Sequence, residues 1–98
     1  MTPEQTFTPD QVREAGLRLA ILAYIKSNAG CYESDIAKAF FGGEEPFKAD
    51  TIARRHLNVL RASTCVRPNK DHLNRQRWYI TVGGSDVLRR VDEMEAPQ

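Results

Sequence analysis

The chain has 98 residues, of which 41% are hydrophobic and 28% charged, and its formal net charge is +1. This length suits one domain with a single core and is too short for a buried active site with its own supporting shell, so a binding module is favoured over an enzyme. No apolar stretch approaches the roughly 20 residues that span a bilayer, and the N-terminus lacks the basic start and apolar middle of a signal peptide, so we expect a soluble cytoplasmic protein with no membrane partner.

The first helix is predicted over residues 9–27, after a flexible segment of residues 1–8. Its start signal is a threonine at Thr8, a proline at the first helical position and Gln11 three residues after the threonine. Residues 17–25 are apolar around the whole circumference, and a helix that is apolar on two sides is buried on two sides. The second side therefore faces either the last helix of the same chain or a second subunit.

A second, shorter helix is predicted over residues 33–41, where acidic and polar residues come first and two glycines follow. We expect a loop over residues 42–48 and a third helix from about residue 48 to residue 62. Such a loop is longer than the turn of about 3 to 4 residues in a strict helix-turn-helix.

The third predicted helix separates its apolar and polar residues cleanly, at roughly 100° per residue. Its apolar side holds Ile52, Ala53, His56, Leu57, Val59 and Leu60. Its polar side holds Thr51, Arg54, Arg55, Asn58, Arg61 and Ala62. Arginine bonds guanine bidentately, asparagine bonds adenine, and both bind phosphate, so this side has the chemistry for base readout and for backbone contact. On an isolated helix the same charges would be no more than the solvated face.

From residue 64 the pattern changes from helical to alternating, which predicts a β-hairpin. A short strand is expected over residues 64–67, and Pro68 must end it or keep it at a sheet edge. A turn follows over residues 69–74, and the second strand runs over residues 75–82.

The second strand of this hairpin has two different sides. Trp78 and Ile80, which share one side of the strand with Gln76 and Val82, are expected to pack on the helices. Arg77 and Tyr79 are expected to face outward. The tip is polar and basic, and it would project toward a phosphate backbone with Lys70, His72, Asn74 and Arg75.

The last helix is predicted to begin after Gly83 and Gly84, with Ser85 as its cap and an apolar stripe that ends at Met94. Residues 95–98 are expected to be a flexible C-terminus. A terminal helix of this kind completes a core or joins two subunits.

The charge of the chain is unevenly distributed. Residues 1–50 carry five basic and eight acidic side chains, whereas residues 51–98 carry nine and five. The segment 54–77 alone has a charge of +6. Because a polyanion responds to local charge, the basic hairpin that follows the basic helix favours a nucleic-acid surface over an ordinary solvated face.

Two segments resemble known regulators. Residues 49–66, ADTIARRHLNVLRASTCV, look like the recognition helix and first wing strand of bacterial winged-helix regulators, and residues 77–88, RWYITVGGSDVL, resemble the second wing strand and the threonine-x-x-glycine step of the MarR and PadR types. The resemblance implies an α+β, mainly α fold over residues 9–94: a winged helix-turn-helix with a three-helix core, a β-hairpin wing and a C-terminal helix. It also implies base and phosphate contacts for the third helix and backbone contacts for the wing.

Other chemistry finds little support in the sequence. Cys31, Cys65, His56 and His72 lack the close ligand spacing of a structural zinc site, and in a cytoplasmic chain the cysteines are expected to be reduced thiols. No phosphate-cradling glycine loop, HExxH motif or recognisable nucleophile is present. We therefore predict no metal, no cofactor and no enzymatic activity.

The sequence thus predicts a small transcriptional regulator that binds double-stranded DNA sequence-specifically, with helix 48–62 in the major groove and wing 66–77 on the backbone. A homodimer is expected through the first and the C-terminal helices. The alternative is a winged-helix adaptor, or a mobile-element protein acting on a host protein, since fold alone does not decide function. The candidate DNA-binding residues are Lys48, Thr51, Arg54, Arg55, Asn58, Arg61, Lys70, His72, Asn74, Arg75 and Arg77.

Overall fold

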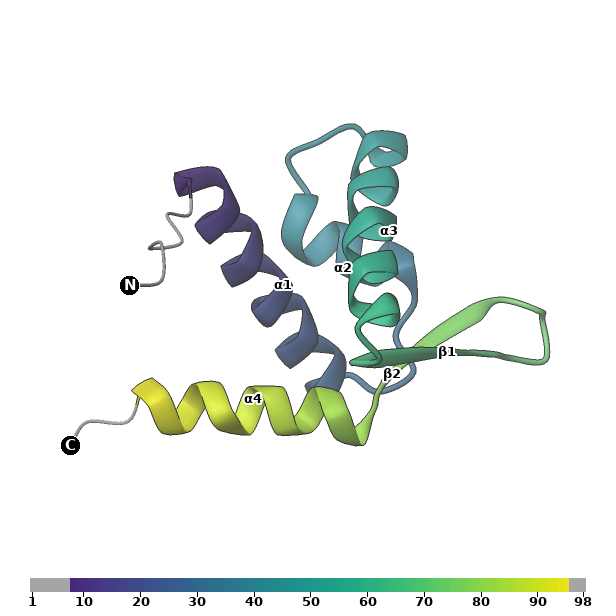
Figure 1. Cartoon of the computed structure of the whole chain (residues 1–98). Helices are drawn as coiled ribbons and strands as arrows, with labels where there is room; N and C mark the ends of the chain where they lie inside the picture. The colour runs from purple at the N-terminus through teal and green to yellow at the C-terminus, as the bar shows by residue number, and fades with distance from the viewer. Residues whose placement is uncertain (1–7, 96–98) are drawn as a thin grey trace.

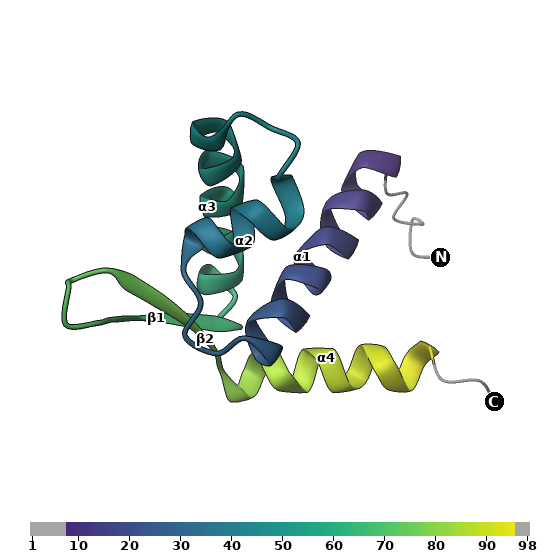
Figure 2. The ribbon, with the colours of Figure 1, turned by 180° about the vertical axis from the view of Figure 1, so that it is seen from behind.

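A computed structural model describes residues 8–95 of the chain, as four helices and a two-stranded antiparallel hairpin (Figure 1). The elements in chain order are α1 (Pro9–Ser27), α2 (Glu33–Phe41), α3 (Pro46–Ala62), β1 (Val66–Lys70), β2 (Gln76–Ile80) and α4 (Val82–Glu95). The hairpin projects away from the helices on one side, and the first turns of α1 and the last turns of α4 lie on the opposite side (Figures 1 and 2). None of the helices in this part of the chain is long and apolar enough to cross a membrane.

The core lies where the three first helices meet the root of the hairpin. Ile21 and Ile25 of α1, Ile36 of α2 and Leu57 of α3 have no exposed surface, and Trp78 of β2 is 4% exposed. Burial of apolar side chains is the main favourable contribution to folding. Because Trp78 belongs to the same cluster, the base of the wing is part of the core.

The predictions for α1 and α2 are confirmed at both ends. Thr8 Oγ1 accepts the Gln11 backbone N–H at 3.2 Å, and Gln11 Oε1 accepts the Thr8 N–H at 2.9 Å, which completes a capping box. Thr8 therefore belongs to the helix start, whereas the rest of the expected N-terminal segment, residues 1–7, lies outside the described residues, as do residues 96–98 of the expected C-terminus.

The turn between α2 and α3 is shorter than predicted. The third helix begins at Pro46, two residues before the expected start, and Pro46 occupies a first-turn position where its missing N–H is not needed. The connection is thus residues 42–45. This length fits a helix-turn-helix, so the departure expected from a loop over residues 42–48 is not found.

The first wing strand lies further along the chain than the predicted residues 64–67. It spans Val66–Lys70 and includes Pro68, which lies opposite Trp78 in the hairpin. The backbone of Trp78 bonds on its other side: its N–H donates to Cys31 O at 2.8 Å and its carbonyl accepts the Gly30 N–H at 2.9 Å. Pro68 therefore lies at a position of the ladder without hydrogen bonds, where a proline costs no bond.

The second wing strand ends at Ile80 and α4 begins at Val82, so the predicted cap at Ser85 is wrong. Thr81 Oγ1 accepts the Gly84 N–H at 3.0 Å and donates to Thr64 O at 2.5 Å. The two glycines that looked like a break lie inside the first turn of α4. Gly84 is needed there because a Cβ at this position would overlap the carbonyl oxygen of Cys65.

The apolar second side of α1 is only partly covered. Its C-terminal half packs against the core, and Val87 and Leu88 of α4 pack against the same cluster. Along the N-terminal half, Val12 is 61% exposed and, with Ala15 and Leu19, lines an open apolar depression. The last helix thus covers only one part of this surface.

A buried histidine predicts that the fold loses stability in mild acid. His56 is 1% exposed and stacks on Phe41 with ring centroids 5.8 Å apart. Burial, reinforced by the charges of Arg18 and Arg55 and opposed by Glu14, lowers the pKa of His56. The folded state then binds fewer protons than the unfolded chain, so the free energy of unfolding should be level above about pH 7 and fall as the pH drops below about 6.5. Denaturant unfolding at a series of pH values measures this slope.

The control for this prediction is the second histidine, His72, which is exposed. Replacing His56 by glutamine should flatten the dependence of stability on pH between about 5 and 7, whereas His72→Gln should keep it. An unchanged slope in His56→Gln would contradict the assignment to His56.

Candidate nucleic-acid interface

The exposed side of α3 carries the predicted polar residues. Ala53, His56, Leu57 and Leu60 of the predicted apolar side are buried, whereas Val59 is 37% exposed. Thr51, Arg54, Arg55, Asn58 and Arg61 are all exposed. The helical period alone therefore identified the outward face of α3 correctly, apart from Val59 at its border.

The two neighbouring arginines of α3 point to opposite edges of this face. Arg54 donates from Nε and Nη2 to the two carboxylate oxygens of Glu33 in α2, both at 3.0 Å. Arg55 donates from Nη2 to Glu14 of α1 at 3.3 Å. Thr51 and Asn58 lie between them on the same exposed face, and the Thr51 hydroxyl donates to the carbonyl of Phe47 at 2.9 Å.

The remaining cations of α3 differ in their surroundings. Lys48 forms an ion pair with Glu44 of the preceding turn at 3.5 Å. Within the described part of the chain, Arg61 has no carboxylate at ion-pair distance. The positive charge on α3 is thus partly compensated by acidic residues from the first half of the chain, which the local count of charges did not show.

At the wing, four side chains form a cluster that we call the wing clamp: Tyr32, Asp71, Arg75 and Arg77. The Tyr32 hydroxyl donates to Asp71 Oδ2 at 2.6 Å and accepts from Arg77 Nε at 3.0 Å. The guanidinium carbons of Arg75 and Arg77 lie 4.7 and 5.1 Å from the Tyr32 ring centroid. The wing clamp ties the hairpin to the residue that precedes α2, and Arg77 is half-buried rather than directed outward as predicted.

Asp71 also forms the wing turn. Its Oδ1 accepts the backbone N–H groups of Leu73 and Arg75 at 2.9 and 3.0 Å, and Asn74 adopts a positive φ of 62°. The side chain is 6% exposed. The Tyr32 hydroxyl, followed by the Arg75 backbone N–H, holds the pKa of Asp71 far below its usual range. Asp71 is therefore ionised at neutral pH and fixes the conformation of the turn.

The outer hairpin residues are arranged around this turn. Lys70, His72 and Asn74 are exposed, as predicted for the tip. Tyr79 was expected to face outward but is half-buried, and Arg67 lies over its ring at 5.5 Å. Leu73 at the tip is 58% exposed.

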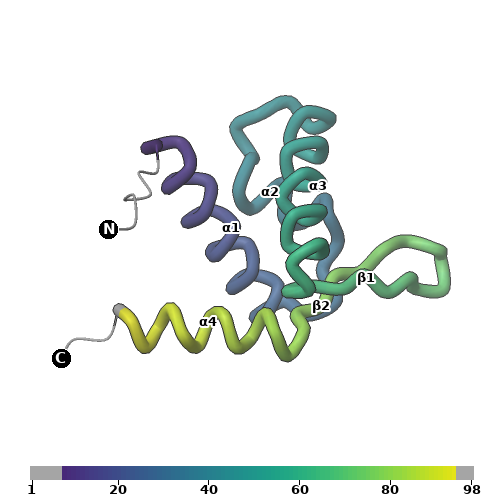
Figure 3. Tube along the Cα trace, in the orientation of Figure 1, coloured from purple at the N-terminus to yellow at the C-terminus, as the bar shows by residue number. Residues whose placement is uncertain are grey.

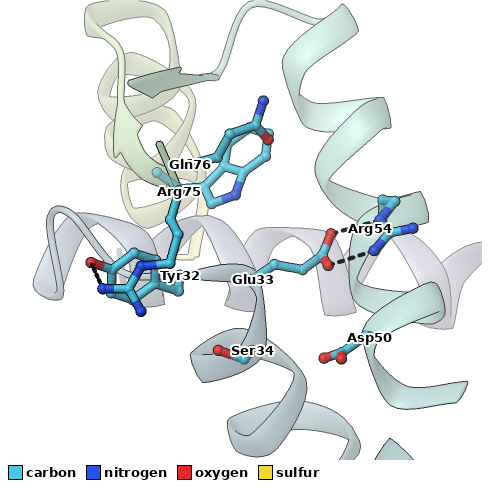
Figure 4. A pocket seen from close by; sticks show the side chains of 8 residues that line it. Tyr32, Glu33, Ser34, Asp50, Arg54, Arg75 and Gln76 are labelled. Atoms are coloured by element: carbon cyan, nitrogen blue, oxygen red, sulfur yellow. Dashed lines mark hydrogen bonds and ion pairs between the residues drawn. The ribbon is translucent and has the colours of Figure 1, made fainter. Parts of the chain in front are cut away.

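An open groove of about 400 Å³ runs between the start of α2, the exposed side of α3 and the second wing strand. Figure 4 shows Arg54 and Arg75 on its two sides, with Glu33 between them and Gln76 beside Arg75. Of the predicted site residues, the fold thus brings Arg54 and Arg75 to one groove. Lys48 and Arg55 do not line it.

Three residues of this region were missed as site residues by the sequence reasoning. The sequence shows Glu33 as one of several acidic residues at and after the start of the second helix and Asp71 as the single acid in the basic segment 54–77, and it gives Tyr32 no role. A signal existed for Asp71, because Asp followed by polar turn formers is typical of a side-chain-stabilised turn. No local pattern relates Tyr32 or Glu33 to partners more than 20 residues away.

The cysteines and other metal-binding types do not form a site in the described residues. Cys31 and Cys65 are both buried and unpaired. Burial raises the pKa of Cys31 to about 11, so its thiol is protonated at neutral pH. No group of three His, Cys, Asp or Glu residues positioned to hold a metal ion is found between residues 8 and 95.

Comparison with known proteins gives matches in structure but not in sequence. No protein-family model and no curated protein matches the chain. The fold is similar to that of the transcriptional regulator SlyA, with a TM-score of 0.64 and 21% identity over 84% of this chain and 57% of SlyA. It is also similar to MepR, a transcription regulator of the Staphylococcus aureus multidrug efflux pump MepA, with a TM-score of 0.65 and 22% identity over 88% of this chain and 67% of MepR.

These matches confirm the predicted fold class. The fold shared with SlyA and MepR is the winged helix-turn-helix that the sequence predicts, with four helices and a two-stranded wing. The chain spans little more than half the length of SlyA.

Proposed function

We propose that the chain is a DNA-binding transcription regulator, acting in the cytoplasm, that places α3 in the major groove of double-stranded DNA and the wing along the backbone. The observation that carries the proposal is the groove lined by Arg54 and Arg75, because it joins the outward face of α3 to a basic hairpin. A helix that fits the major groove and a ribbon that contacts phosphates are the two parts of such an interface. The winged-helix fold of SlyA and MepR supports this function.

We further propose that two copies associate through α1 and α4. The exposed apolar depression along the N-terminal half of α1 supports this pairing, since it leaves Val12, Ala15 and Leu19 available to a partner. Both helix ends lie on the side away from the wing (Figures 1 and 2), so pairing there leaves both wings and both α3 helices free. A symmetric dimer reads an inverted repeat whose half-sites are about 34–36 Å apart.

Binding of random-sequence duplex at increasing salt tests the proposed function. Each protomer offers Arg61, Lys70 and the wing clamp arginines, and a dimer that neutralises 6 to 10 phosphates loses roughly 10³- to 10⁵-fold in affinity between 50 and 200 mM salt. We expect a fall of this size, measured by fluorescence anisotropy of a labelled duplex. Undetectable binding at low salt would contradict the proposal and support the protein-binding adaptor instead.

A further inference from the structure

The pair formed by Arg54 and Glu33 has a geometry that bears on what Arg54 recognises. A guanidinium has five N–H donors in a planar fork. Glu33 takes the Nε–H and one Nη2–H, each at 3.0 Å. The three remaining donors are both hydrogens of Nη1 and the second hydrogen of Nη2. One hydrogen of Nη1 and the second hydrogen of Nη2 form the free end of the group, which is the edge that can bond O6 and N7 of guanine together.

The exposed fractions of the two side chains show that Glu33 lies deeper in the protein than Arg54. The Glu33 side chain is 25% exposed, whereas that of Arg54 is 63% exposed. Glu33 is held by the first turn of α2, where a carboxylate is favoured by the helix dipole. A bidentate pair anchored at such a position fixes the direction of the guanidinium toward solvent.

The charge around Arg54 disfavours a phosphate. Glu33 neutralises Arg54, and Asp50, one turn earlier on α3, adds a second negative charge on the same side of the groove. A phosphate approaching the free edge of Arg54 meets these two carboxylates, whereas the guanine edge is uncharged and offers two acceptors.

We infer that Glu33 is a positioning residue that directs Arg54 to a guanine base rather than to the DNA backbone, which makes the pair a determinant of sequence specificity for one G·C base pair in each half-site. The inference rests on the proposed function and names the base that the same site reads.

The experiment is selection of bound sequences from a random duplex pool, followed by affinity measurements on the selected duplex and on duplexes altered at each position. For the native chain we expect one position at which G·C is strongly preferred. Arg54→Ala should lose about ten- to a hundredfold in preference at that position and little elsewhere. Glu33→Gln should lose the same preference while the double variant Glu33→Gln/Arg54→Ala behaves like Arg54→Ala alone.

Salt dependence separates positioning from a merely structural role. In Glu33→Gln the released arginine gains a phosphate, so the slope of log K against log salt should steepen by about 0.9 for each protomer. Glu33→Asp keeps the charge but shortens the side chain, so it should keep the native slope and lose part of the base preference. Glu33→Asp also keeps an acidic residue in the first turn of α2. It is therefore the second variant to use if circular dichroism shows that Glu33→Gln does not fold.

The matched control is the neighbouring pair of Arg55 and Glu14. Glu14 makes a single hydrogen bond to Arg55 at 3.3 Å and shares its carboxylate with Arg18. Glu14→Gln should therefore leave the preference for G·C intact.

Two results would overturn the inference while leaving the proposed function in place. One is an unchanged G·C preference in Glu33→Gln. The other is an equal loss for all sequences in Arg54→Ala, with a slope shallower by about 0.9 for each protomer, which would mean that Arg54 binds phosphate. If the native chain binds no duplex at low salt, the proposed function and the inference fail together.

Discussion

Replacing Gly84 by alanine is expected to lower the free energy of unfolding by about 3 kcal/mol, at the upper end of the cost of overpacking. An added Cβ would overlap the carbonyl oxygen of Cys65 and lie 2.8 Å from Cγ1 of Ile80. The Cys65 carbonyl oxygen belongs to the backbone at the root of the wing, so no side-chain rotation relieves the clash. Denaturant unfolding followed by the fluorescence of Trp78, the single tryptophan, measures the change.

The preceding glycine is the matched control. A Cβ at Gly83 would meet the Thr64 carbonyl oxygen at 3.5 Å and Thr81 Oγ1 at 3.6 Å, which is ordinary contact. Because alanine also restricts the unfolded chain, Gly83→Ala should be neutral or stabilise by up to about 1 kcal/mol. Helix propensity favours alanine at both positions, so equal destabilisation by the two substitutions would contradict the view that the approach of α4 to the wing root specifically requires glycine at position 84.

Truncating Trp78 to alanine should cost about 3–5 kcal/mol, the range found for large aromatic side chains removed from cores. Trp78 is 4% exposed and belongs to the cluster that joins the wing to α1, α2 and α3. The variant lacks the only tryptophan, so its unfolding must be followed by circular dichroism.

An apolar residue from the same hairpin serves as its control. Leu73, at the wing tip, is 58% exposed, and Leu73→Ala should change stability by less than about 0.5 kcal/mol. A small effect for Trp78→Ala, close to that of Leu73→Ala, would contradict the view that the wing root is part of the core.

The ends of the first two helices could be predicted because their signals are local. Thr8 and Gln11 cap α1 within four residues of each other, and the glycines at 42 and 43 follow α2 directly. The start of α3 depended on a proline that was assigned to a loop, although the same signal had been used correctly at Pro9. The same local chemistry is therefore present at the starts of α1 and α3.

The start of α4 could not be read in the same way. Thr81 caps the helix, and its hydroxyl also donates to the carbonyl of Thr64, 17 residues earlier in the chain. Glycine is required at position 84 because the backbone there contacts Cys65. Both partners come from the wing root. Tertiary contact, rather than the local preference of glycine for loops, therefore decides the conformation of residues 82–84.

In the candidate interface, too, the features that depend on local sequence could be predicted and those that depend on tertiary contacts could not. Helical periodicity identified the outward face of α3, because that face depends only on spacing within one element. The pairs that shape the charge of the interface are Arg54 with Glu33 on α3 and Asp71 with Tyr32 at the wing, and they join residues 21 and 39 positions apart. Such pairs arise from how α2 lies against α3 and the wing. As a result, the basic segment is not uniform: Glu33 orients Arg54, and Asp71 partly neutralises the wing arginines.

The short connection between the wing and α4 has a mechanical consequence. Thr81 alone separates the end of β2 from the start of α4, and the tube in Figure 3 shows the strand continuing directly into the helix. With no linker to absorb a change of angle, and with Gly84 in contact with the wing root, the angle between α4 and the hairpin is fixed by a single residue. A tilt of α4 against α1 would therefore strain the wing root directly, because the core and the wing clamp hold the hairpin in place.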